Sequence, residues 1–283
     1  MMKIQKRNAY SKAKIILFSV LFIVLAFTIS SKKVSAAEDD VVYIPDANLK
    51  ALLNEKLDVD DLTADITEGQ LALINSLFIE FSDNKIINDF TGISYCINLK
   101  HLYIHGSPKA VIKENFDEEL GKLTRITDFS IESVQGVDYS FIENWSELRE
   151  IDIYSCDIKA LPDLSKCRWL ETLKITYCGQ LADILSVSKL KYLEKVVLRN
   201  CESLTDISPL EGIKRIKFLE LSNQAITENN KNAYMKTIAS LVDLEQLYVD
   251  FCDITDEHTS LFDSLTKLKV LNLRGNKISD IKF

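Results

Sequence analysis

A nine-residue pattern that recurs along the chain constrains its fold more than any other feature. The pattern is L-x-x-L-x-L-x-x-N/C, with an apolar residue at the first, fourth and sixth places. The five closest copies begin at Leu148, Leu170, Leu193, Leu244 and Leu268. Four looser copies begin at Ser76, Leu99, Ile126 and Ile216. Successive copies start 22 to 28 residues apart, so the chain consists largely of about nine similar units.

The frame of the first copy is open. Ile74, Leu77 and Ile79 fit the first, fourth and sixth places as well as Ser76, Ile79 and Phe81 do.

Each copy predicts a short strand whose fourth and sixth side chains point inward, because side chains two apart lie on one face of a strand. One coil cannot bury its apolar side alone, so neighbouring coils must stack. This is the leucine-rich repeat signature. It predicts an α/β solenoid over residues 76–283, with parallel strands on the concave face and 3₁₀ turns or short helices on the convex face. Two long copies leave room for helices at 114–123 and 230–241.

Residues 37–75 are expected to form a helical N-terminal cap on the stack. Thr67 and Gln70 have the spacing of a capping box. Asp46 can cap an earlier helix that carries apolar residues at helical spacing, namely Leu49, Leu52, Leu53 and Leu57.

The segment IPDANLKALLN…DITEGQLALI, followed by repeats of about 22 residues, resembles the internalin-like secreted leucine-rich repeat proteins of Gram-positive bacteria. The resemblance covers residues 43–283. It implies binding of a host or surface protein on the concave face, with the partner differing among members. Many relatives continue into an immunoglobulin-like domain and a cell-wall anchor, whereas this sequence ends at Phe283. We therefore expect no covalent anchor.

Residues 1–36 are predicted to be a signal peptide. They contain seven Lys and Arg and no acid, an apolar stretch at 15–29, and the small-residue triplet Val34-Ser35-Ala36. The alternative is an uncleaved membrane anchor, but this stretch is shorter than the roughly 20 residues that span a bilayer. We expect a secreted or surface-associated monomer that is not inserted in a membrane after signal cleavage.

The charge and the lack of catalytic motifs argue against several classes of function. Residues 37–283 carry 27 Lys and Arg against 42 Asp and Glu, a net charge of −15, which argues against a nucleic-acid partner. We find no catalytic motif and predict neither enzyme activity nor a cofactor. His101 and His105 should face the concave side, but a metal site needs three or four ligands and only Asp128 and Glu132 lie nearby, so we predict no metal site. His258 lies in a returning segment without suggestive neighbours.

The six cysteines are expected to be free and buried rather than paired. Four of them occupy the ninth place of a copy: Cys156, Cys178, Cys201 and Cys252. Cys96 and Cys167 lie in returning segments. A bridge between the ninth places of adjacent coils stays open, because neighbouring strands lie about 4.8 Å apart.

Aromatic and arginine side chains at exposed places of the strands are the candidate partner-binding residues, because such residues supply much of the energy of protein interfaces. They are Tyr103, Tyr154, Tyr177, Arg199, Phe218, Tyr248 and Phe251. The other interpretation is that aromatic residues merely suit a pleated strand. Our first functional hypothesis is a non-enzymatic binding protein for a protein partner; the alternative is a cell-envelope component that binds glycan or wall polymer.

Overall fold

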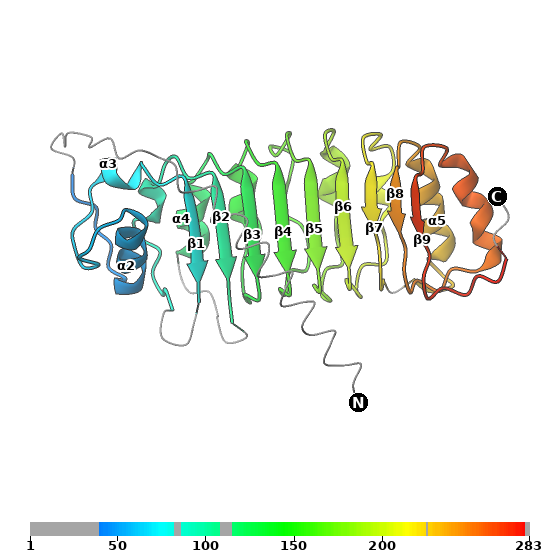
Figure 1. Cartoon of the computed structure of the whole chain (residues 1–283), viewed down its shortest axis with the longest axis horizontal. Coiled ribbons are helices and arrows are strands. Elements are labelled where there is room, and N and C mark those ends of the chain that lie inside the picture. The colour runs from blue at the N-terminus through cyan, green and yellow to red at the C-terminus, as the bar shows by residue number, and fades with distance from the viewer. Residues whose placement is uncertain (1–39, 82–85, 108–114, 225, 281–283) are drawn as a thin grey trace, which may run out of the picture. The chain divides into compact units, whose positions relative to one another are not determined.

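The computed structural model describes residues 40–81, 86–107, 115–224 and 226–280. Within these residues, nine parallel strands form one sheet in chain order (Figure 1). They are β1 (Ser76–Glu80), β2 (His101–His105), β3 (Asp128–Glu132), β4 (Glu150–Tyr154), β5 (Thr172–Thr176), β6 (Lys195–Arg199), β7 (Phe218–Glu220), β8 (Gln246–Tyr248) and β9 (Val270–Asn272). The predicted signal peptide, residues 1–36, lies outside the described residues.

The strand register decides the frame of the first copy. Leu77 of β1 pairs with Leu102 of β2, which is a fourth-place residue. The first copy therefore begins at Ile74, and the frame that begins at Ser76 is wrong. In the other eight copies the fourth-place residues align with one another as predicted.

The core follows the repeat pattern. In the central coils the first, fourth and sixth residues are buried, as Leu170, Leu173 and Ile175 illustrate. Burying one such side chain stabilises the fold by roughly 1.5 to 3 kcal/mol. Because every coil contributes three, the stacked coils share one continuous apolar core.

The ninth place has a specific polar role. Its side chain donates to the sixth-place carbonyl of the preceding coil: Cys178 Sγ lies 3.8 Å from Ile153 O, and Asn276 Nδ2 lies 2.6 Å from Val249 O. All six cysteines are free and buried, which confirms the prediction. Burial raises the pKa of the Cys178 thiol to about 12.

Short helices form the layer behind the sheet (Figure 1). They are η1 (Ile93–Tyr95), α4 (Phe116–Gly121), η2 (Tyr139–Asn144), η3 (Leu185–Lys189), η4 (Ser208–Leu210), α5 (Lys231–Ser240) and η5 (Asp256–Ser264). Helix α5 confirms the helix predicted at 230–241. Helix α4 is shorter than the predicted 114–123, because the left-handed backbone of Asn115, with φ 65°, precedes its first residue.

The N-terminal cap contains the two predicted helix starts. Asp46 accepts hydrogen bonds from the backbone N–H groups of Asn48 and Leu49 and begins α2 (Ala47–Lys56). Thr67 and Gln70 form the predicted capping box at the start of α3 (Glu68–Leu71).

The returning segments of the early coils pack through aromatic rings, which the repeat pattern did not predict. Phe116 lies edge-on to Phe90, with ring centroids 4.9 Å apart, and to Phe141, at 5.7 Å. Trp145 is fully buried, and its Nε1 donates to Leu120 O at 3.2 Å. These rings form part of the core of the early coils.

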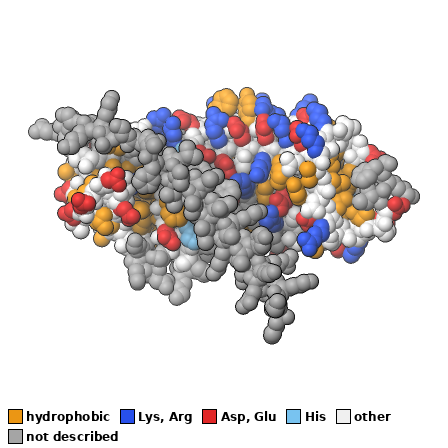
Figure 2. Space-filling model, in the orientation of Figure 1, with side chains coloured by type: hydrophobic (Ala, Val, Ile, Leu, Met, Phe, Trp, Pro, Cys, Tyr) orange, Lys and Arg blue, Asp and Glu red, His pale blue; other side chains and the backbone are white. Residues whose placement is uncertain are grey.

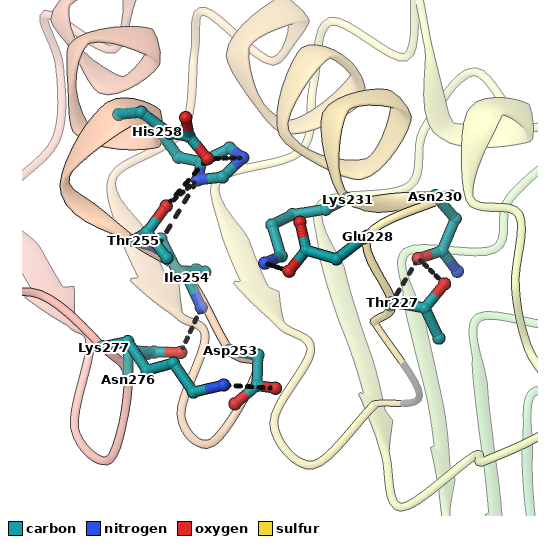
Figure 3. A network of polar contacts seen from close by, with 11 residues as sticks. Thr227, Glu228, Asn230, Lys231, Asp253, Ile254, Thr255, His258, Asn276 and Lys277 are labelled. Atoms are coloured by element: carbon teal, nitrogen blue, oxygen red, sulfur yellow. Dashed lines mark hydrogen bonds and ion pairs between the residues drawn. The ribbon is translucent and has the colours of Figure 1, made fainter.

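A polar network links the turns of the last coils (Figure 3). His258 is buried, and its Nδ1 accepts a hydrogen bond from the Thr255 N–H at the start of η5. Lys231 is also buried, with its Nζ 2.5 Å from Glu228 Oε1. His258 therefore caps a helix, a structural role that its position in a returning segment did not indicate.

Candidate functional site

The exposed face of the sheet, called the strand face below, displays the third, fifth and seventh places of each copy. Its acidic and basic side chains alternate with aromatic ones, and Figure 2 shows hydrophobic side chains exposed over strands β6 to β9. The predicted partner-binding residues lie on this face or at its edge, where the strands end.

The first aromatic cluster joins two neighbouring coils. Tyr154 ends β4 and Tyr177 follows β5, and their ring centroids lie 5.3 Å apart in an edge-to-face arrangement. The two tyrosines are 39% and 49% exposed. Partial burial, with the neighbouring Tyr177, raises the pKa of Tyr154. Tyr154, Tyr177 and Arg199 are predicted partner-binding residues of three successive coils, and the structure brings the first two together.

The third residue, Arg199, is engaged by its own neighbour. Its Nε donates to Glu220 Oε1 at 2.7 Å on the next strand. The Arg199 guanidinium lies close enough to Tyr154 to oppose the rise in the tyrosine pKa. Arg199 therefore borders the tyrosine pair and is held in place by Glu220.

A second cluster lies toward the C-terminal end of the strand face. The rings of Phe218 and Tyr248 stack with centroids 5.3 Å apart. Lys195 places its Nζ 4.9 Å from the centroid of the Phe218 ring, a cation–π geometry. Lys195 also belongs to this cluster. It was not among the predicted partner-binding residues, because only aromatic and arginine residues were considered.

The eighth place of a copy has an unusual backbone. From the third copy onward its residue has a positive φ of 55° to 74°: Ser133, Ser155, Tyr177, Asn200, Asn223, Phe251 and Gly275. This left-handed region suits Gly and Asn and disfavours bulky side chains. The chain nevertheless has Tyr177 and Phe251 there, about half exposed.

Phe251 lies against the next coil. A Cβ atom at Gly275 would meet its ring at 2.3 Å, so the ring occupies space that only a glycine leaves open. The Arg274 Cζ lies 5.9 Å from the centroid of the same ring. Phe251 is therefore fixed in position although it is half exposed.

Tyr103 differs from the other candidates because it belongs to neither cluster; it lies on β2 and is half-buried. Burial, with the nearby Asp128 carboxylate, raises its pKa to about 12. The flanking His101 and His105 each face one carboxylate of β3, Asp128 at 2.8 Å and Glu132 at 3.3 Å. Among the described residues, no group of three or more potential metal ligands occurs.

The basic residue Lys174 is not the freely exposed side chain that its fifth place suggests. Its Nζ contacts Glu150 and lies 3.6 Å from Asp152 on β4. Burial raises the pKa of Asp152, and the Lys174 ammonium opposes this rise. The middle of the strand face thus has paired charges next to the tyrosine cluster.

Comparison with known proteins identifies the fold. The leucine-rich repeat family matches residues 264–281. The structure is similar to that of internalin C2 from Listeria monocytogenes, with a TM-score of 0.55 and 20% sequence identity over 88% of this chain and 94% of that one. The internalin InlF of the same organism aligns over 84% of this chain and 92% of its own, with 17% identity and a TM-score of 0.36. No curated protein sequence matches significantly.

The leucine-rich repeat match and the likeness to internalin C2 show an internalin-like leucine-rich repeat fold. In the part of the chain that the structure describes, no helix is long and apolar enough to cross a membrane.

Proposed function

We propose that this protein is a secreted, non-enzymatic binding protein that uses its strand face to bind a protein partner, including a host protein. The leucine-rich repeat fold supports a binding role, because stacked coils present an extended rigid surface. The export pattern of residues 1–36 supports an extracellular place of action.

The observation that carries this proposal is the pair of exposed aromatic residues at left-handed places. A bulky residue in this conformation costs of order 1 to 3 kcal/mol and persists when something else favours it. About half of each side chain remains exposed at Tyr177 and Phe251, so contacts within the chain cover only part of each ring. Binding of a partner is a function that these two side chains can serve and that Asn or Gly at the same places cannot.

The composition of the strand face favours a protein over a glycan. Aromatic and arginine residues dominate the energetic centres of protein interfaces. Around the tyrosine pair, Arg199 is held by Glu220 and Lys174 by two carboxylates, so the charges are positioned before a partner arrives. Such mixed, fixed charges favour a partner with complementary charges and reduce the cost of ordering side chains on binding.

The same contacts argue against catalysis on this face. The carboxylates around the tyrosine pair all contact a neighbouring side chain: Glu132 lies 3.3 Å from His105, and Glu150, Asp152 and Glu220 are engaged by Lys174 or Arg199. A general acid or base must instead reach the substrate. We therefore propose a binding function without chemistry.

Capture of partners from an extract, before and after protease treatment of that extract, tests the proposal. We expect the wild-type protein to retain a protein that the Tyr154→Ala/Tyr177→Asn variant does not, and protease treatment to abolish retention. Leu185→Ala, an exposed change on η3 behind the sheet, is the matched control and should bind normally. Retention that survives proteolysis would favour the glycan alternative. Equal retention by both variants would exclude the strand face.

A further inference from the structure

A second exposed aromatic pair lies away from the strand face, at the edge where the strands begin. Trp169, Tyr192 and Arg215 each occupy the place just before the first apolar residue of their copy, in three successive coils. The rings of Trp169 and Tyr192 have centroids 5.1 Å apart and planes tilted by 34°. The Arg215 Cζ lies 5.2 Å from the Tyr192 centroid. Together they form a row that we call the edge platform.

Folding does not require aromatic residues at these positions. Trp169 and Tyr192 are 48% and 37% exposed. The equivalent places in the other coils hold no aromatic residue: they are Leu73, Asn98, Arg125, Glu147, Asp243 and Lys267. Two large apolar rings on an exposed edge therefore provide a surface for something outside the chain.

A row of bases runs beside the edge platform, one residue earlier in each of the same three coils. These residues are Arg168, Lys191 and Lys214, and all are exposed. Within the described residues, none of the three forms an ion pair, so their charges are available to a ligand. Figure 2 shows the result at the top edge of the molecule, where hydrophobic side chains over β4 to β6 are flanked by Lys and Arg.

The carboxylates near this edge are neutralised by other bases. Glu194 lies 2.5 Å from an Arg215 nitrogen and 2.9 Å from Lys217 Nζ. Glu171 lies 2.7 Å from Arg149. The edge is therefore locally basic on a chain whose residues 37–283 have a net charge of −15.

From this arrangement we infer that the edge platform binds an acidic polysaccharide. The apolar C–H faces of sugar rings pack on exposed indole and phenol rings, which offer large, rigid apolar surfaces. Carboxylates on alternate sugars lie two sugar lengths apart, about twice the coil spacing of about 4.8 Å, so successive carboxylates would meet Arg168 and Lys214, with Lys191 between them. The Tyr192 ring is already held by the Arg215 guanidinium, so it needs little ordering when a ligand arrives.

The charge distribution favours a polymer of sparse charge over a nucleic acid. Nucleic acids bind mainly through many cations that neutralise closely spaced phosphates. This edge offers three bases without ion pairs, and the surrounding protein is acidic and would repel a dense polyanion. A polysaccharide with one carboxylate on every second sugar places a carboxylate at the first and third bases, and its lower charge density reduces that repulsion.

Binding of a hyaluronan oligosaccharide, which alternates an acetylated amino sugar with a uronic acid, tests the inference by titration calorimetry at low salt. We expect binding by the full protein, none of a chitin oligosaccharide, which has the amino sugar without the acid, and weaker binding at high salt. Trp169→Ala and Lys191→Gln/Lys214→Gln should each weaken binding about tenfold, equivalent to 1.4 kcal/mol.

Matched control variants show whether the loss of affinity is specific to the edge platform or follows the loss of any exposed aromatic ring or base. Tyr43→Ala removes a more exposed aromatic ring from the N-terminal cap, and Lys236→Gln removes an exposed base from α5. Both should bind hyaluronan normally, and so should Tyr177→Asn, so that failure here is distinct from failure of the strand-face proposal. The inference is overturned if hyaluronan does not bind, if chitin binds equally well, if a single-stranded oligonucleotide binds more tightly, or if the controls lose as much affinity as Trp169→Ala.

Discussion

The left-handed backbone at Tyr177 predicts an unusual order of stability among its variants. With φ 57°, Tyr177 adopts a conformation that costs an ordinary L-residue roughly 1 to 2 kcal/mol and that Asn adopts readily. An alanine at position 177 would have the same conformational cost as tyrosine, whereas an asparagine would avoid most of it. We therefore expect Tyr177→Asn to be more stable than Tyr177→Ala by about 1 kcal/mol.

Both variants lose the same aromatic contact. The edge-to-face pair with Tyr154 is worth about 0.5 to 1.5 kcal/mol beyond the area it buries. Tyr177→Ala should therefore be destabilised by about 1 kcal/mol, whereas relief of the backbone brings Tyr177→Asn close to the wild-type stability. Because both variants lack the aromatic contact, the difference between their free energies of unfolding reports only the conformational cost of the backbone at position 177.

Tyr154 provides the control because it ends strand β4 and its φ is not positive. Tyr154→Asn should be no more stable than Tyr154→Ala, since Asn is unfavourable in strands. Urea denaturation of the four variants, analysed with a common m-value, measures both differences. The reasoning is refuted if Asn and Ala are equally stable at position 177, or if Asn is favoured equally at both positions.

Three further predictions concern the core, the thiols and pH. Leu173→Ala should lower the free energy of unfolding, measured by urea denaturation, by about 2 to 5 kcal/mol. The exposed change Gln180→Ala should alter it by no more than roughly ±0.5 kcal/mol. Similar losses in the two variants would contradict the strand register. Cys178 should react with a thiol reagent only in denaturant, and rapid reaction of the folded protein would show that it is accessible. Burial and the nearby Asp138 raise the pKa of Asp117 to about 6, so its ionisation opposes folding increasingly between pH 4 and 6. Asp117→Asn should therefore stabilise the protein at pH 8 and not at pH 4, and an equal gain at both would contradict this.

The repeating part of the fold was predictable from the sequence because the same apolar pattern recurs in every coil and predicts the same strand each time. The fourth and sixth places are buried in successive coils, and the ninth place donates back to the preceding coil through Cys, Gln or Asn alike. The cap starts at Asp46 and Thr67 were also predictable, because capping depends on residues within one helical turn.

Features that depend on contacts between coils could not be predicted in the same way. The frame of the first copy was ambiguous because both frames place apolar residues two apart, and only pairing with β2 favours Ile74. The edge-on rings of Phe90, Phe116 and Phe141 come from returning segments of different lengths, which have no common period.

The sequence predicted which coils contain the residues of the candidate site, but it did not predict their backbone conformation. The repeat frame places Tyr154 and Tyr177 in adjacent coils, and the structure brings their rings together. The strain at the eighth place could not be seen in the sequence, although Asn200, Asn223 and Gly275 at that place are the residue types that signal a left-handed turn. The ion pairs of Lys174 were not predicted, because its carboxylate partners lie on the preceding strand.

Hydroxyl-radical footprinting of the wild-type protein, alone and with a captured protein partner, tests the central claim most directly. The half-exposed rings of Tyr177 and Phe251 should be oxidised in the free protein and protected in the complex. Trp169, Tyr192 and Tyr43 are exposed elsewhere and serve as internal references, so their oxidation should not change. Protection of these references with continued oxidation of Tyr177 and Phe251 would contradict binding at the strand face.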